Sequence, residues 1–163
     1  MGKGAIIVWL LLLLAACGTP KQETPLDYAG QVGSTDLSGE RVIGIELGDS
    51  EASVMDLRGK PNRTVQMDSF EVWEYGDANY TMSDGRVISY VISYAATRNG
   101  IKVGDTMQSV RDKYGDAYYN RTYDNISYMG YIDKEKRWVL EFVASGDVVT
   151  GIVIGELSLF EDD

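Results

Sequence analysis

The sequence predicts an α+β fold in which a short helix followed by a three-stranded antiparallel β-meander occurs twice in tandem. Three observations lead to this prediction: an internal repeat, helical stretches that end at glycine, and runs of strand-forming residues separated by turn signals. Residues 44–59 align with 100–115 at an offset of 56 residues, with eight identities in sixteen ungapped positions. This degree of identity indicates that one structural unit is present twice.

Polar residues mark the start of each predicted helix. In the first unit, Asp49 or Ser50 can accept hydrogen bonds from the exposed backbone N–H groups of the helix N-terminus. Asp105 or Thr106 can do the same in the second unit. A repeated pair of carboxylates could instead serve a hydrolase as acid and base, which requires two facing carboxyl groups in a cleft. We expect Asp49 and Asp105 to be structural helix caps.

Glycines mark the end of each helix after about nine residues. Gly59 and Gly115 stand where a left-handed C-cap is expected, and Pro61 follows the first of them. Helices this short are not stable alone in water, so both must be held by packing against the rest of the fold.

Three strands are predicted after each helix. They cover residues 70–75, 79–83 and 86–94 in the first unit, and 126–132, 137–144 and 148–154 in the second. Asp84-Gly85 is a strong two-residue hairpin turn, because glycine supplies the positive φ that such a turn needs. A three-stranded sheet with one helix is marginal alone, so we expect the units to pair their sheets or share a core.

These motifs resemble known families. The repeat Gly-Ile-x-x-Gly-Asp-Ser/Thr-x-x-x-Val is followed by Gly59-Lys60-Pro61, Trp73-Glu74-Tyr75 and the Asp84–Val87 hairpin. Over about 44–155 the pattern is similar to the BamE (SmpA/OmlA) lipoproteins and the tandem-repeat β-lactamase inhibitor proteins. It also resembles the domain that precedes CAP domains in secreted Gram-positive proteins. The resemblance implies a protein-binding or assembly role without catalysis, by analogy of fold.

The first seventeen residues are predicted to be a lipoprotein signal peptide. Lys3 precedes an apolar run over 5–14, which is too short to span a bilayer, and the run ends in Leu14-Ala15-Ala16-Cys17. This resembles a lipobox, in which the cysteine thiol receives a diacylglyceryl group; the alternative is an ordinary signal peptide with a chance cysteine. We expect a protein lipid-anchored through Cys17 to the outer face of the plasma membrane, or to the outer membrane where there is one.

The remaining chain divides into three predicted parts. Residues 18–40 contain two of the three prolines and scattered single apolar residues, which predicts a flexible tether. Repeat unit 1 covers 41–97, and repeat unit 2 covers 98–163 with an acidic tail. We therefore expect the folded domain to begin near residue 41.

Composition excludes several classes of function. The formal charge of −10 argues against sequence-independent binding to nucleic acid. The absence of histidine removes Ser-His-Asp and Cys-His catalysis and His-ligated zinc, and a single cysteine removes Cys-cluster metal sites. We expect no catalytic residues, no metal and no cofactor. The remaining alternatives are a cell-wall or small-ligand sensor or inhibitor, and more remotely a carboxylate-dependent hydrolase.

Tyrosine is the unusual residue, with eleven copies in 163 residues. A duplicated unit inherits one core, so function should concentrate where the copies differ. Tyr118, Tyr119, Tyr123 and Tyr128 replace non-aromatic residues of the first unit at the same offset. Tyrosine offers a large contact area and a hydroxyl group, so we expect these four to form an exposed patch that binds another envelope protein or a peptide.

The lipid anchor is directly testable. Cys17→Ser removes the thiol that would be acylated, so the variant should accumulate as an unlipidated precursor or as a soluble form. Partitioning into the detergent phase measures this. Unchanged partitioning of the variant would show that the lipobox assignment is wrong.

Overall fold

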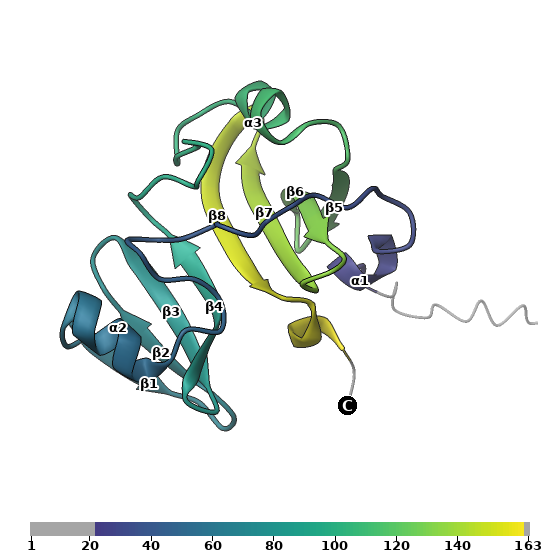
Figure 1. Cartoon of the computed structure of the whole chain (residues 1–163). Coiled ribbons are helices and arrows are strands. Elements are labelled where there is room, and N and C mark those ends of the chain that lie inside the picture. The colour runs from purple at the N-terminus through teal and green to yellow at the C-terminus, as the bar shows by residue number, and fades with distance from the viewer. Residues whose placement is uncertain (1–21, 162–163) are drawn as a thin grey trace, which may run out of the picture.

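Eight strands form one antiparallel sheet in the computed structural model, which describes residues 22–161 (Figure 1). The strands are β1 (Arg63–Gln66), β2 (Glu71–Glu74), β3 (Ala78–Ser83), β4 (Arg86–Ile92), β5 (Tyr119–Tyr123), β6 (Ile126–Asp133), β7 (Trp138–Ser145) and β8 (Val148–Glu156). The helices are α1 (Pro25–Tyr28), α2 (Glu51–Arg58), α3 (Met107–Tyr114) and the 3₁₀ turn η1 (Leu157–Phe160). The order across the sheet is β1-β2-β3-β4-β8-β7-β6-β5, so β4 and β8 meet at its centre.

Each half of the sheet is a four-stranded meander, and the prediction of three strands per unit is wrong by one. The missed strands are β1 and β5, which form the two edges of the sheet. Both are short and polar (RTVQ and YNRTY), and most of their residues are exposed. Edge strands need little apolar surface, so hydrophobic alternation does not mark them.

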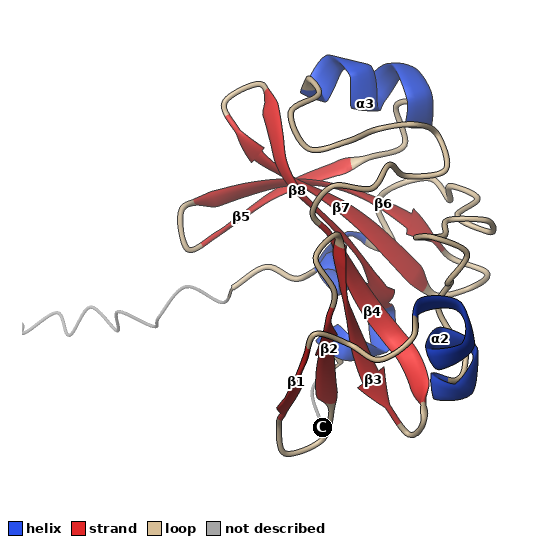
Figure 2. Cartoon of the chain, turned by 90° about the vertical axis from the view of Figure 1, so that its left-hand side faces the viewer, coloured by secondary structure: helices blue, strands red, loops and turns tan. Residues whose placement is uncertain are grey.

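Helices α2 and α3 lie on the same face of the twisted sheet, as Figure 2 shows. Each follows the same polar start: Ser50 Oγ accepts from Ser53 N–H, and Thr106 Oγ1 accepts from Ser109 N–H. Their buried residues, including Val54 and Val110, join the main hydrophobic core. Hydrophobic packing therefore holds two eight-residue helices that would be unstable alone.

Asp49 and Asp105 are not the helix caps. Each is one residue too early, and its carboxylate closes the preceding turn instead. Asp49 Oδ2 accepts from Glu46 N–H at 3.0 Å, and Asp105 Oδ2 accepts from Lys102 N–H at 2.8 Å. The adjacent hydroxyl residue caps the helix because its side chain reaches the third helical N–H group.

Gly59 and Gly115 end the helices at positive φ, as predicted, but not in the left-handed helical conformation. Their φ angles are 70° and 84°, and their ψ angles are −162° and −167°, a region that essentially only glycine occupies. This conformation turns each carbonyl toward the sheet, where Tyr75 Oη donates to Gly59 O and Tyr131 Oη donates to Gly115 O.

Residues 22–40 are not a flexible tether but an ordered arm that wraps around one end of the sheet. On the face opposite α2 and α3, apolar side chains of the arm pack on a second hydrophobic cluster, which includes Tyr119, Ile132 and Val139. The arm side contributes Leu26, Tyr28, Ala29 and Val32. Part of this set lies on the single-turn helix α1, and four scattered apolar residues are too few for the sequence to reveal a helical face.

The arm then crosses to the other face at the β6–β7 turn. Thr35 N–H donates to Ile132 O at 2.8 Å, and Leu37 N–H donates to the buried carboxylate of Asp133 at 3.0 Å. Beyond this point Leu37 is fully buried in the main core. Glu40 is also buried, and its carboxylate accepts from Tyr114 Oη at 2.7 Å. The folded domain therefore begins before residue 41.

The predicted signal peptide, including Cys17, lies outside the described residues. Within 22–161, no helix is both long enough and apolar enough to cross a bilayer.

Docking of the arm predicts a large loss of stability for Leu37→Ala. Truncating a fully buried leucine should lower the free energy of unfolding by about 2–5 kcal/mol. Leu57→Ala is the matched control, because that side chain is 61% exposed and should matter by about 0.5 kcal/mol or less. Urea denaturation followed by circular dichroism measures both. Equal effects would show that the arm does not belong to the folded core.

Candidate functional site

Two clefts lie at equivalent positions in the two halves, each between a helix and the outer hairpin. The α2 cleft, between α2 and β1–β2, measures about 640 Å³, and the α3 cleft, between α3 and β5–β6, about 500 Å³. The offset of 56 residues relates five pairs of lining residues: Glu51/Met107, Met55/Arg111, Thr64/Asn120, Glu71/Ser127 and Trp73/Met129. The two halves thus have clefts at equivalent positions, and the residues that line the two clefts differ in character.

The α2 cleft combines apolar and charged side chains. Its apolar residues are Ala52, Met55, Pro61 and Trp73, and its charged residues are Glu51, Lys60 and Glu71. Trp73 is fixed because β2 turns it toward the core, where it is 8% exposed. An aromatic residue among a few charged groups is typical of sites that hold an apolar side chain and orient the chain around it.

The α2 cleft opens onto a free strand edge. Within the described part of the chain, β1 pairs with β2 alone. Met67 N–H donates to Phe70 O at 2.9 Å, so Met67 faces β2. Along an antiparallel edge strand, residues whose backbone groups bond to the neighbouring strand alternate with residues whose backbone groups point away from it. Thr64 and Gln66 therefore point their backbone N–H and C=O groups away from the sheet. Thr64 also lines the cleft, so the outward-facing backbone and the hollow form one continuous surface.

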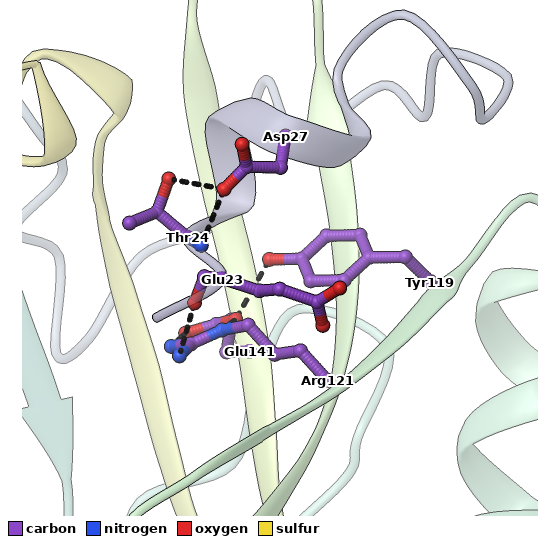
Figure 3. Close-up of polar contacts among 6 residues, drawn as sticks. All are labelled: Glu23, Thr24, Asp27, Tyr119, Arg121 and Glu141. Carbon is purple, nitrogen blue, oxygen red and sulfur yellow. Dashed lines mark hydrogen bonds and ion pairs between the residues drawn. The ribbon is translucent and has the colours of Figure 1, made fainter. Parts of the chain in front are cut away.

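The α3 cleft has a charged wall held by a buried ion pair. Arg121 Nε and Nη2 donate to the two carboxylate oxygens of Glu141 at 2.7 and 2.6 Å (Figure 3). Tyr119 Oη donates to the same carboxylate at 2.7 Å, and the Tyr128 ring covers the guanidinium at 4.2 Å. Arg121 Nη1 also reaches Glu23 O at 3.5 Å, which ties the arm to β5. The charges of this pair are neutralised within the protein.

Burial and charge set the titration of this cluster. Burial, reinforced by the negative charge of Glu141, raises the pKa of Tyr119 far above its ordinary value. Burial is the largest influence on Arg121 and acts to lower its pKa, but the hydrogen bonds to Glu141 and the attraction to the charge of Glu141 together raise the pKa above its ordinary value. Tyr119 lies directly over Gly130, where a Cβ atom would stand 2.1 Å from the tyrosine ring. The cluster is therefore a packed and neutral structural element near neutral pH.

The predicted tyrosine patch does not exist as one exposed surface. Tyr119 is 2% exposed and stacks on Tyr28 of the arm, with 4.7 Å between ring centroids. Tyr118 is half-buried against Tyr131 of the main core. Tyr128 is half-buried beneath Arg121, and Tyr123 alone is well exposed, at 44%. The segment is a strand and not a loop, so alternate residues turn toward the face that the arm covers.

The buried carboxylates of the described residues all have structural partners. Glu40 accepts from Tyr114 Oη and from Arg98 N–H, and Asp133 accepts from three backbone N–H groups. Glu141 is held by Arg121 and Tyr119. Across residues 22–161, no buried side-chain N or O atom lacks a partner, and no group of three potential metal-ligating side chains gathers.

Sequence reasoning missed the α2 cleft, although part of its signal was present. Lys60-Pro61 and Trp73 were recognised as family-like motifs, but their proximity depends on strand β1, which was not predicted. A tryptophan on a predicted strand next to a proline-terminated helix is the pattern that could have indicated the cleft.

Comparison with known proteins finds likeness in structure alone. No family model matches the chain, and no curated protein matches it. An extracellular protein containing an SCP domain, from Bacillus anthracis, superposes with a TM-score of 0.48 at 11% identity, covering 77% of this chain and 49% of that one. This chain thus spans about half the length of that protein.

Two further structures superpose over most of this chain, one of them less closely. The DUF4309 family protein YjgB from Bacillus subtilis has a TM-score of 0.48 at 17% identity, over 80% of this chain and 91% of that one. A β-lactamase inhibitor-like protein from Streptococcus mutans has a TM-score of 0.29 at 15% identity, over 82% and 98%. None of these superpositions establishes a family for this chain.

The Arg121–Glu141 pair predicts a stability difference between two glutamate variants. Glu141→Gln leaves a buried guanidinium without its counter-charge, so the free energy of unfolding should fall by about 3–5 kcal/mol. Glu161→Gln removes the partner of Arg137 in an exposed pair and should leave the unfolding midpoint nearly unchanged. Guanidinium chloride denaturation compares the two; equal midpoints would rule out a stabilising role for the buried pair.

Proposed function

We propose that this protein is a non-enzymatic protein-binding or assembly module of a bacterial envelope, lipid-anchored through Cys17. The observation that carries the binding role is the α2 cleft beside the free edge of β1. An extended segment of a partner can add to β1 through backbone hydrogen bonds and place an apolar side chain beside Trp73. Backbone pairing supplies affinity in this mode, and the cleft supplies selectivity.

The charged groups around the α2 cleft describe the partner segment. Lys60 lines the cleft together with the acidic residues Glu51 and Glu71, and Arg63 on β1 pairs loosely with Glu74 at 3.8 Å. Mixed charges of this kind favour a segment that carries both signs around a central apolar residue. A polyanionic strand of nucleic acid fits poorly, because the chain is strongly acidic.

The structural use of the buried carboxylates supports a role without catalysis. A hydrolytic pair of carboxyl groups must face a shared substrate, with one of them shifted in pKa by its surroundings. Here Glu40, Asp133 and Glu141 are each saturated by hydrogen bonds from the fold. These three carboxylates are therefore engaged by the fold and are not free to act on a substrate.

A small ligand is the second candidate for the α2 cleft. A volume of about 640 Å³ lies within the range of ordinary ligand sites. A cell-wall fragment or another small molecule could then make this protein a sensor or inhibitor. Such a ligand needs the hollow alone, whereas a peptide needs both the hollow and the outward-facing backbone of β1.

We also propose that the two halves arose by duplication of one unit. Matched backbone contacts support this: Gly48 N–H donates to Val87 O, and Gly104 N–H donates to Val149 O, each at 2.8 Å. The hydroxyl groups of Tyr75 and Tyr131 donate hydrogen bonds to the carbonyl oxygens of the matched glycines that end α2 and α3. In both halves, therefore, the turn before the helix and the glycine after it are bonded to the strands in the same way. A chance similarity of short motifs would not be expected to reproduce both contacts.

The binding role predicts position-specific losses of partner capture from native membranes. Ala52→Arg places a bulky cation in the α2 cleft, and Thr64→Pro removes an outward-facing N–H group of β1. Each should reduce capture by about tenfold or more, as a loss of 1.4 kcal/mol would. The matched controls are Gln108→Arg and Asn120→Pro, at the equivalent positions of the other half, and they should capture normally.

Crosslinking and quantitative mass spectrometry of the same set separates the alternatives. Loss with Ala52→Arg but not with Thr64→Pro indicates a small ligand in the cleft. Equal capture by all four variants would show that the partner site lies elsewhere.

A further inference from the structure

We infer that the tip of the β5–β6 hairpin rests on the lipid surface that holds the anchor. This inference rests on the proposed acylation of Cys17. It assigns a membrane-facing end to the domain, with Tyr123 and Ile126 as the contacting side chains. The β1 edge and its α2 cleft then lie at the other end of the sheet, away from the membrane.

The ordered arm leaves little chain between the anchor and the fold. The packed part begins within a few residues of Gln22, and five residue steps separate Gln22 from Cys17. At no more than 3.6 Å per residue, these steps reach at most about 18 Å. A 23-residue flexible spacer would have allowed the domain to move freely, but this distance holds it against the bilayer.

The start of the arm lies beside the β5–β6 hairpin. The backbone oxygen of Glu23 is 3.5 Å from Arg121 Nη1, and Figure 3 shows Glu23 beside the Arg121–Glu141 pair. Glu23 also lines the α3 cleft together with Thr122 and Tyr128 of that hairpin. The side of the domain nearest the anchor is therefore the β5 edge.

The chemistry of the hairpin tip suits the interface between lipid and water. Tyr123 and Ile126 face each other across the two strands and are 44% and 41% exposed. Asp124 and Asn125 form the turn between them, both at positive φ. A tyrosine ring beside a branched aliphatic side chain gives an apolar contact with a hydroxyl group at its border, which is typical of residues at headgroup depth.

Electrostatics make this contact dependent on the anchor. The chain carries a formal charge of −10, and Asp124 and Glu23 are acidic residues close to the tip. Anionic headgroups therefore do not attract the domain, and two exposed apolar side chains are too few to bind a bilayer alone. The covalent lipid brings the tip to the surface, and the tip sets the orientation.

The test compares the two outer hairpins in the acylated full chain. Acylation blocks the thiol of Cys17, the one natural cysteine, so an introduced cysteine can be labelled with an environment-sensitive fluorophore. Ile126→Cys reports on the β5–β6 tip. Met67→Cys is the matched control on the β1–β2 hairpin, since Met67 is 48% exposed and stands at the far edge of the sheet.

Both labelled proteins are placed in vesicles of phosphatidylethanolamine and phosphatidylglycerol that carry a lipid-borne quencher. We expect at least about a threefold greater quenching at position 126 than at position 67, with a blue-shifted emission at 126. Equal quenching at the two positions would overturn the orientation.

The mass of the N-terminal peptide separates the two levels of the proposal. An acylated Cys17 with equal quenching overturns the membrane contact alone and leaves the anchor intact. An unmodified Cys17 overturns the anchor and the contact together. In either case, the capture experiment with the α2 cleft variants tests the proposed binding role separately.

Discussion

The pairing of β4 with β8 is the constraint on which the rest of the structure depends. Four residue pairs, from Ser89–Gly155 to Ile92–Ile152, join two meanders into one sheet. Gly155 also leaves room for η1 to pack on this seam, because a Cβ atom there would lie 3.1 Å from the Leu159 side chain. This seam places α2 and α3 on one face and sends the two outer hairpins to opposite edges, where the clefts form.

Sequence reasoning recovered the central elements of the fold because they carry strong local signals. Helices α2 and α3, the Asp84–Gly85 turn and six strands follow from glycine, hydroxyl and β-branched residues, whose conformational preferences act locally. The edge strands and the arm were missed because their structure depends on distant partners. The backbone N–H of Leu37 is held by the carboxylate of Asp133, and no hydrophobic periodicity within 22–40 predicts that contact. The exposure of the tyrosine patch was mispredicted for the same reason: Tyr119 is an inward position of a strand that the local pattern did not reveal.

The two halves use equivalent positions for different purposes. Arg58 ends α2, stacks on Tyr75 at 4.6 Å and pairs with Asp77 at 2.5 Å. Its counterpart in α3 is Tyr114, which packs on Tyr131 and Phe142 and donates to Glu40. The second half is thereby bound to the arm through buried contacts, whereas the first half keeps its outer hairpin and cleft open. The arm thus packs on β5 at the edge of the second half, whereas within the described residues β1 at the edge of the first half pairs with β2 alone.

The wrapped arm also constrains the order in which the chain can fold. A ribosome or export channel delivers residues 22–40 before the strands on which they pack. Leu37 cannot form its hydrogen bond to Asp133 until a further 96 residues have emerged. The first meander can close from local contacts while the arm is still unplaced. The arm docks only after β7 has emerged, so for most of its synthesis this protein carries an uncovered apolar segment next to its N-terminus. Until β6 and β7 have paired, this segment is exposed to non-native contacts and to binding by chaperones.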